Sequence, residues 1–149
     1  ISILNNQAIR SELKKGYISE RMITEAFPFA NRIGRCTITG EQLYNAIDSS
    51  IKSGYPLQIS GIKIINNNNK LIIKDLNNKI VKQTDIITVA TTDYVINGGD
   101  NLITSPVEKQ EIFDIYLFNF VKFKLIDLKE INSYNYLFEE RYIGFNNEQ

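Results

Sequence analysis

Gly98-Gly99-Asp100 combines the residue types most suited to holding a polar ligand, and it follows a stretch with the composition of a buried strand. The two glycines permit positive φ angles or a close approach of the backbone to a bound group. The Asp100 carboxylate could then accept hydrogen bonds from a diol. Turns of this composition are also common where nothing binds, and from these residues alone a turn without a ligand is the more frequent case.

A second polar segment, Asn5-Asn6-Gln7-Ala8-Ile9-Arg10, also follows an expected strand. A turn that ends in arginine can present the planar guanidinium group to a phosphate or a carboxylate. Phe27-Pro28-Phe29 places two rings around the end of a helix. Solvated arginines and buried phenylalanines are the ordinary alternatives, so each feature taken singly indicates no more than a soluble α+β domain.

The composition excludes several kinds of catalytic site. The 149 residues include no histidine and one cysteine, Cys36. A zinc site built from His and Cys cannot form within this chain, and neither can a Ser-His-Asp or Cys-His nucleophilic system. The 17 basic and 17 acidic residues balance, so no net field attracts a nucleic acid polymer or an anionic membrane.

The chain opens at Ile1, inside an expected strand, and its residues are expected to include neither a signal peptide nor a transmembrane stretch. We expect a single domain over residues 1–149 that is a piece of a longer protein. Its class is predicted to be α+β, a mixed β-sheet domain with flanking helices. Alternating apolar residues predict strands at 1–5, 32–38, 57–65, 71–74, 80–82, 86–92 and 140–145, and turns are predicted at 66–69 and 94–100.

Three helices are predicted between these strands. One begins after Ser19 and runs to about Ala26. The best defined begins after Thr39, which has capping-box spacing to Gln42, and ends at Gly54 in a left-handed cap. The third follows Pro106 from about Val107 to Leu125, and its stripe of aromatic residues is interpreted as core, namely Phe113, Tyr116, Phe120 and Phe123.

The order of these motifs resembles one family, the C-terminal domain shared by 5'-nucleotidases, UDP-sugar hydrolases and apyrases. The resemblance covers roughly residues 2–104. It rests on the turn ending at Arg10, Pro28-Phe29-Ala30-Asn31, Thr39-Gly40 with its helix, the Leu-Gln-x-Ser-Gly run at 57–61, and an aromatic six residues before Asp100. Asn6, Gln7 and Ala8 replace three glycines of the family motif, and Ala30 replaces another. If that turn needs positive φ, Ala8 would be strained.

The resemblance implies a role for each matching residue. Arg10 would contact the phosphate or ribose side of a nucleotide, and Asn5 would approach the base. Phe29 and Tyr94 would be the two rings that sandwich the nucleobase, and tyrosine keeps the stacking face of the family's phenylalanine. Asp100, after Gly98 and Gly99, would hold the ribose hydroxyls.

The resemblance also implies that the chemistry lies outside this chain. In the family, a separate N-terminal metallophosphoesterase domain carries two divalent metal ions and a His-Asp dyad, and the substrate-binding domain moves as a rigid body to bring substrate to the metals. The chain would thus have no catalytic residue, metal site or cofactor of its own. The full-length protein would be a periplasmic, cell-surface or secreted hydrolase of nucleoside 5'-monophosphates or related nucleotides, with a homodimer as one open assembly.

Two alternatives stay open from the sequence. The full-length protein could be a catalytically inert family member with a nucleotide-binding role. The domain could instead be a protein-interaction module of the same fold with an empty pocket. Loss of the metal-ligand Asp and His residues upstream would favour the first, and nucleotide affinity that is insensitive to Phe29 and Tyr94 would favour the second.

Overall fold

A computed structural model describes residues 1–104, 107–131 and 141–145, and they form two mixed sheets with helices around them. This arrangement confirms the predicted α+β class. In chain order the elements are β1 (Ser2–Leu4), η1 (Asn6–Ala8), α1 (Glu20–Ala26), β2 (Arg32–Thr39), α2 (Gly40–Lys52), β3 (Gln58–Ser60), β4 (Ile62–Asn67), β5 (Lys70–Asp75), β6 (Ile86–Thr92), α3 (Asp93–Ile96), η2 (Gly99–Asn101), β7 (Glu108–Tyr116), α4 (Leu117–Leu128) and β8 (Tyr142–Ile143).

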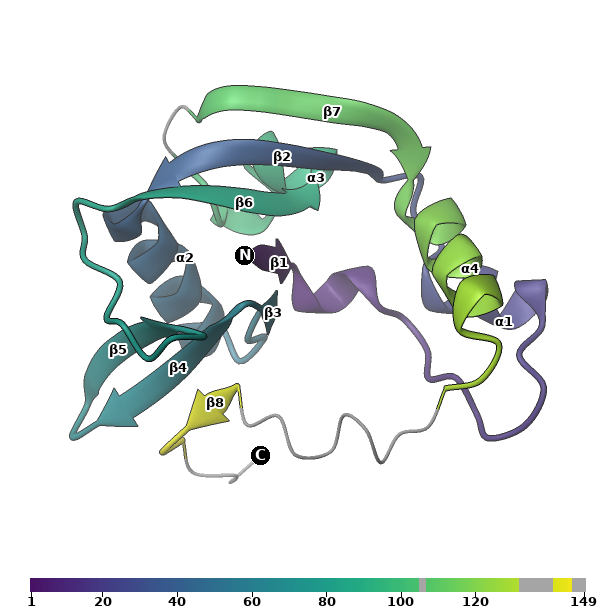
Figure 1. The fold of residues 1–149 in the computed structure, drawn as a ribbon, viewed down its shortest axis with the longest axis horizontal. Helices are drawn as coiled ribbons and strands as arrows, with labels where there is room; N and C mark the ends of the chain where they lie inside the picture. The colour runs from purple at the N-terminus through teal and green to yellow at the C-terminus, as the bar shows by residue number, and fades with distance from the viewer. Residues whose placement is uncertain (105–106, 132–140, 146–149) are drawn as a thin grey trace.

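The five-stranded sheet has the order β3-β1-β6-β2-β7. β1 runs parallel to β6, whereas β2 runs antiparallel to β6 and to β7. The carboxyl ends of β1 and β6 therefore lie at the same end of the sheet as the beginning of β2 (Figure 1). This end of the sheet receives the segments that carry the predicted ligand-binding residues.

The three-stranded sheet has the order β5-β4-β8. The turn between β4 and β5 places Asn68 and Asn69 at φ angles of 51° and 63°, a conformation that asparagine tolerates better than most residues. The predicted hairpin is thus confirmed, and β8 confirms the predicted closing strand near the C-terminus. The strand predicted at 80–82 is reduced to one isolated bridge, between Lys74 and Ile80.

The single strand predicted at 57–65 is wrong, because the chain breaks at Gly61. Its φ of +83° is left-handed, and a Cβ at this position would lie 3.2 Å from the Cα of Ile1. β3 therefore joins the first sheet and β4 the second. The buried positions shift by one residue at the break, from Leu57 and Ile59 to Ile62 and Ile64, and the prediction of one strand overlooked this shift.

Helix α2 contributes to the core between the two sheets (Figure 1). Leu43, Ala46 and Ile47 on one face of the helix are at most 1% exposed. Tyr44 extends toward the second sheet, where its hydroxyl donates to the Val81 carbonyl at 3.1 Å and accepts from the Ile73 amide at 3.0 Å. The helix therefore ties both sheets into one core.

The start of α2 carries the predicted capping box. The Gln42 amide donates to Thr39 Oγ1 at 3.2 Å, and the Thr39 amide donates to Gln42 Oε1 at 2.7 Å. Thr39→Ala removes one of these reciprocal bonds and is expected to cost about 1 kcal/mol of stability. Thermal unfolding followed by circular dichroism should show Tm lower by about 2–4 °C. Gln42→Glu keeps the box and is the control; an unchanged Tm for Thr39→Ala would contradict the assignment.

The long helix predicted from Val107 to Leu125 is wrong in its first half, and Pro106 lies outside the described residues. Glu108–Tyr116 is instead strand β7, which pairs with the outer edge of β2. Pairing satisfies backbone groups that β2 would otherwise leave open, and this tertiary gain outweighs the helical spacing of the aromatics. Phe113 and Tyr116 thus lie on a strand, and Phe120 and Phe123 on α4.

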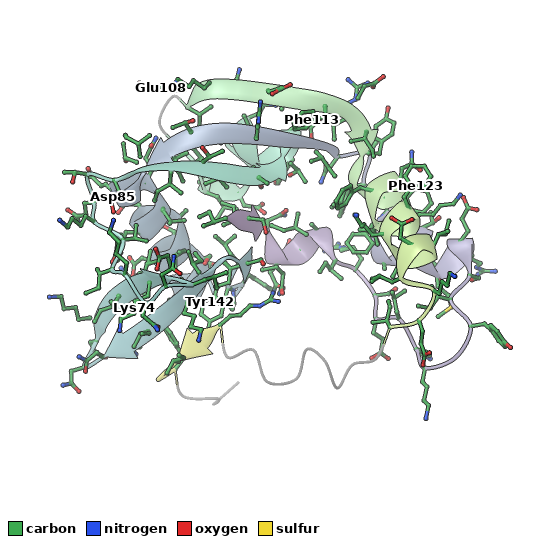
Figure 2. All side chains as sticks on the ribbon, in the orientation of Figure 1. Lys74, Asp85, Glu108, Phe113, Phe123 and Tyr142 are labelled. Carbon is green, nitrogen blue, oxygen red and sulfur yellow. The ribbon has the colours of Figure 1, made fainter. Side chains whose placement is uncertain are left out.

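The aromatic stripe is also not core. Phe113 is 36% exposed and Phe123 is 55% exposed; Figure 2 labels the first on β7 and the second on α4. Two arginines of β2 contact the rings of β7: Arg35 Cζ lies 5.9 Å from the ring centroid of Phe113, and Arg32 Cζ lies 5.5 Å from that of Tyr116.

Candidate functional site

The predicted ligand-binding residues come from segments that meet at one end of the first sheet. Asn5 follows β1, Phe29 precedes β2, and Tyr94 lies in α3 directly after β6. The antiparallel register pairs Ile33 with Thr92. One step beyond that pair, the Arg32 amide donates to Asp93 Oδ1 at 3.0 Å. The segments that carry Phe29 and Tyr94 are thereby held at the same end of the β2–β6 pair.

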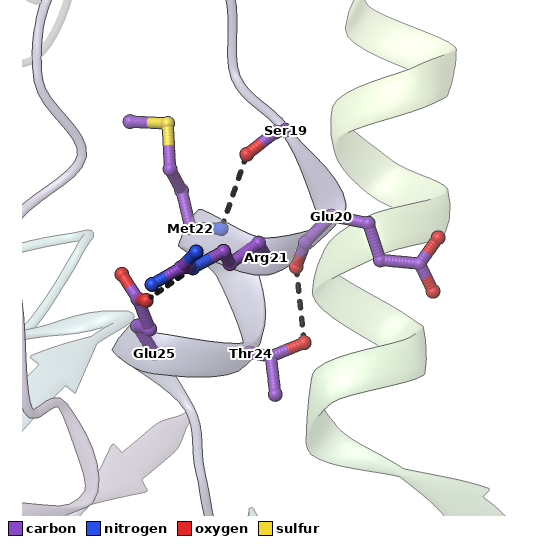
Figure 3. Close-up of polar contacts among 6 residues, drawn as sticks. All are labelled: Ser19, Glu20, Arg21, Met22, Thr24 and Glu25. Carbon is purple, nitrogen blue, oxygen red and sulfur yellow. Dashed lines mark hydrogen bonds and ion pairs between the residues drawn. The ribbon is translucent and has the colours of Figure 1, made fainter.

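Helix α1 positions the first half of the site. Figure 3 shows its capped start, where the Met22 amide donates to Ser19 Oγ at 3.3 Å, as predicted. At its other end, the Ala26 carbonyl accepts from the Arg10 amide at 2.9 Å. The end of α1 therefore lies against the segment that leads from Asn5 to Arg10.

Arg10 and Phe29 meet in this half of the site. The Cζ atom of Arg10 lies 5.6 Å from the ring centroid of Phe29, within the range of a cation–π contact. The Phe29 ring is 45% exposed, and Arg10 is exposed. A partly exposed ring beside a guanidinium can take a planar apolar group on its free face and an anionic group next to it.

The second half of the site is built around Asp100. The predicted turn at 94–100 is wrong in detail, because α3 and η2 occupy it, joined by Gly98 at φ 86°. Asp100 itself has a left-handed φ of 53°. Its Oδ1 accepts from the Tyr94 hydroxyl at 2.8 Å, and its Oδ2 accepts from Asn5 Nδ2 at 2.9 Å.

These contacts set the electrostatics of the second half. The hydrogen bond to Asp100 raises the pKa of the Tyr94 phenol above its ordinary value, with a smaller contribution from desolvation. Tyr94 therefore stays a neutral donor at physiological pH. Asn5 is 7% exposed, and its Oδ1 is buried without a hydrogen-bond partner among the described residues. A buried carbonyl oxygen without a partner favours a bound donor, such as a hydroxyl, an amino group or water.

Gly99 fixes the position of the Tyr94 ring. A Cβ at this position would lie 2.4 to 2.6 Å from three carbons of that ring, closer than any real contact. The ring thus packs against the bare backbone of Gly99, while 41% of Tyr94 stays exposed. The absence of a side chain at Gly99 thus makes room for the Tyr94 ring, a role beyond the turn that the sequence predicted for this glycine.

The structure groups the predicted residues as two clusters, Asn5 with Tyr94 and Asp100, and Arg10 with Phe29. The chain from Asn5 to Arg10 and the Arg32–Asp93 hydrogen bond connect them. Residues 6–8 form η1 without any positive φ. The strain considered for Ala8 therefore does not arise, and Ala8 is buried.

A cavity beside Asp100 was missed from the sequence. It has a volume of about 230 Å³ and is bounded by η1, the last turn of α2 and η2. Besides Asn5 and Asp100, its polar lining includes Ser49, Ser53 and Tyr55. The serines at the end of α2 have the composition of an ordinary solvated helix end, so the sequence alone carries no signal of the cavity.

No group of three or more His, Cys, Asp or Glu side chains in the described part of the chain could hold a metal ion. The described residues therefore do not fit a two-metal centre. No helix of residues 1–104, 107–131 or 141–145 has the length and apolarity needed to span a membrane.

The sequence profile of the 5'-nucleotidase C-terminal domain matches residues 1–110. The chain belongs to this family. No match was found among curated protein sequences. This 5'-nucleotidase C-terminal domain also resembles solved structures. The 5'-nucleotidase precursor from Thermus thermophilus has a TM-score of 0.80 at 17% identity, over 95% of this chain and 31% of that chain.

Two further structures share the fold. The putative 5'-nucleotidase from Staphylococcus aureus, solved in complex with alpha-ketoglutarate, has a TM-score of 0.59 at 14% identity over 84% of this chain and 30% of its own. The NAD nucleotidase of Haemophilus influenzae has a TM-score of 0.54 at 19% identity over 68% of this chain and 21% of its own. The chain thus spans less than a third of each of these three proteins.

Proposed function

We propose that this domain binds the nucleotide substrate of a 5'-nucleotidase-type phosphoester hydrolase. The nucleobase stacks between Phe29 and Tyr94, Asp100 accepts the ribose hydroxyls, and Arg10 faces the phosphate. The observation that carries the proposal is the pair of partly exposed rings at one end of the sheet, one beside a guanidinium and the other bonded to a carboxylate.

The chemistry of each contact suits a nucleotide. Base–aromatic stacking contributes roughly 1–3 kcal/mol per base and tolerates different bases. The free face of Phe29 can take the base, while the guanidinium of Arg10 beside it neutralises the charge of a phosphate. Asn5 Oδ1, buried and without a partner among the described residues, offers an acceptor to an amino group of the base or to a sugar hydroxyl.

Hydrolysis is assigned to a different part of the full-length protein. The described residues hold no group that fits a metal, and the chain contains no histidine. We propose an N-terminal metallophosphoesterase domain with two divalent metal ions as the partner of this domain, and a periplasmic, cell-surface or secreted location. Upstream sequence that lacks the metal-ligand Asp and His residues would instead identify an inert nucleotide-binding protein of the same fold.

The role of Arg10 predicts a selective effect on phosphorylated ligands. Arg10→Met is expected to weaken AMP binding about two- to fivefold, because an exposed charge pair contributes up to about 1 kcal/mol. Adenosine binding should change less, since the ring of Phe29 stays in place. Isothermal titration calorimetry or ligand-observed NMR with both ligands measures the difference.

Arg35→Met is the matched control, because Arg35 makes the same type of contact with Phe113 at 5.9 Å on β7. It should leave the affinity for both ligands unchanged. Equal losses of AMP and adenosine affinity in Arg10→Met would contradict a phosphate role, and equal losses in both arginine variants would point to a nonspecific charge effect.

A further inference from the structure

The hydroxyl of Tyr94 distinguishes this site from one built with two phenylalanines. The resemblance to the family treats residue 94 as a stacking ring, a role for which phenylalanine is sufficient. In the structure the hydroxyl donates to Asp100 Oδ1 at 2.8 Å, while the ring packs on Gly99. Residue 94 thus belongs both to the stacking surface and to the polar part of the site.

Each oxygen of the Asp100 carboxylate accepts one hydrogen bond from a side chain. Tyr94 binds Oδ1 and Asn5 binds Oδ2. An ionised carboxylate offers about four acceptor positions, roughly two on each oxygen. After one donor on each oxygen, one acceptor position remains on each. Two acceptor positions on adjacent oxygens suit the two neighbouring hydroxyls of a ribose.

The contacts also restrain Asp100 in a single orientation. Its backbone is left-handed at φ 53°, and Asn5, which holds the other oxygen, is 7% exposed and therefore fixed by its surroundings. A carboxylate held on both oxygens loses little rotational freedom when a ligand binds, and this preorganisation strengthens binding. Without the hydroxyl, the carboxylate would be held on one side only.

We infer that Tyr94 is a positioning residue that determines sugar specificity: with Asn5 it orients Asp100 to accept both hydroxyls of a vicinal diol, so that the site selects ribonucleosides over deoxyribonucleosides. This inference rests on the proposed function. It predicts a division of roles within one side chain, in which the ring binds the base and the hydroxyl acts through Asp100 on the sugar.

The test compares the wild-type chain with Tyr94→Phe against adenosine and 2'-deoxyadenosine, by calorimetry or ligand-observed NMR titration. Wild type should prefer adenosine. Tyr94→Phe should weaken adenosine binding about fivefold, the size of one ordinary hydrogen bond, and leave 2'-deoxyadenosine nearly unchanged, so that the preference disappears. Phe29→Leu is the control, because loss of a stacking ring should weaken both ligands equally.

A preference that persists in Tyr94→Phe, or an equal loss for both ligands, would overturn the inference and leave the proposed function standing. Failure of the wild-type chain to bind adenosine, 2'-deoxyadenosine and AMP would overturn both. The contact itself is checked without ligand: NMR titration of the Tyr94 ring should give a pKa above the ordinary tyrosine value that returns toward it in Asp100→Asn. No difference between the two proteins would also overturn the inference.

Discussion

Replacing Phe29 and Tyr94 together by alanine is expected to weaken adenosine and AMP binding by about 30-fold or more. Each ring is assigned roughly 1–3 kcal/mol of stacking free energy, and the lower bound of two such terms corresponds to this factor. The fold should persist, because the rings are 45% and 41% exposed and neither belongs to the buried core. Calorimetry or saturation-transfer NMR measures the loss.

The matched control for this double variant is Phe123→Ala. Phe123 is 55% exposed on α4, a helix that carries none of the proposed binding residues. Its removal should leave nucleotide affinity unchanged. Affinity that is unaltered in the double variant would show that the domain does not recognise the base by stacking, and would favour a protein-interaction module of the same fold.

A single methyl group at position 99 is expected to lower adenosine affinity nearly as much as removal of the Tyr94 ring. In Gly99→Ala the new Cβ would lie 2.4 Å from a ring carbon of Tyr94, so the ring must move. The variant should lose roughly 5- to 150-fold in adenosine affinity, the range for one stacking contact. Gly99 has no positive φ, so the change should act through the steric contact and not through backbone strain.

A double-mutant cycle tests this mechanism. If the methyl group acts only by displacing the ring, Gly99→Ala should cost little in a chain that already carries Tyr94→Ala, because neighbouring groups that share one contact are non-additive. Full additivity of the two losses would instead place the effect in the η2 backbone. Wild-type affinity in Gly99→Ala would contradict the packing of Tyr94 on Gly99.

The sequence predicted the local elements well wherever a local signal exists. Thr39 and Gln42 specify the start of α2 by reciprocal hydrogen bonds, and the asparagines of the β4–β5 turn suit left-handed angles. The sequence-based predictions failed where pairing between strands distant in the sequence determines the structure. β7 has helical aromatic spacing but pairs with the open edge of β2. Gly61 moves the chain between sheets, and only a one-residue shift in the buried positions, from Ile59 to Ile62, accompanies this break.

The candidate site shows the same division. The resemblance to the family names Arg10, Phe29, Tyr94 and Asp100, but it does not show which of them touch. The contacts arise because β1 and β6 run parallel and end together. The hydrogen bond from Tyr94 to Asp100 requires the tyrosine hydroxyl, which has no part in stacking and was therefore given no role from the sequence. The role of Gly99 depends on the position of the Tyr94 ring in the structure.

The central claim is that a nucleobase lies between the rings of Phe29 and Tyr94. The most direct measurement is NMR of the chain with AMP, in which NOEs are sought between the adenine H2 and H8 protons and the ring protons of both residues. The account predicts NOEs from adenine to both rings, with shift changes at Asn5 and Asp100 from the ribose. NOEs to neither ring at millimolar AMP, or contacts confined to another surface of the domain, would contradict it.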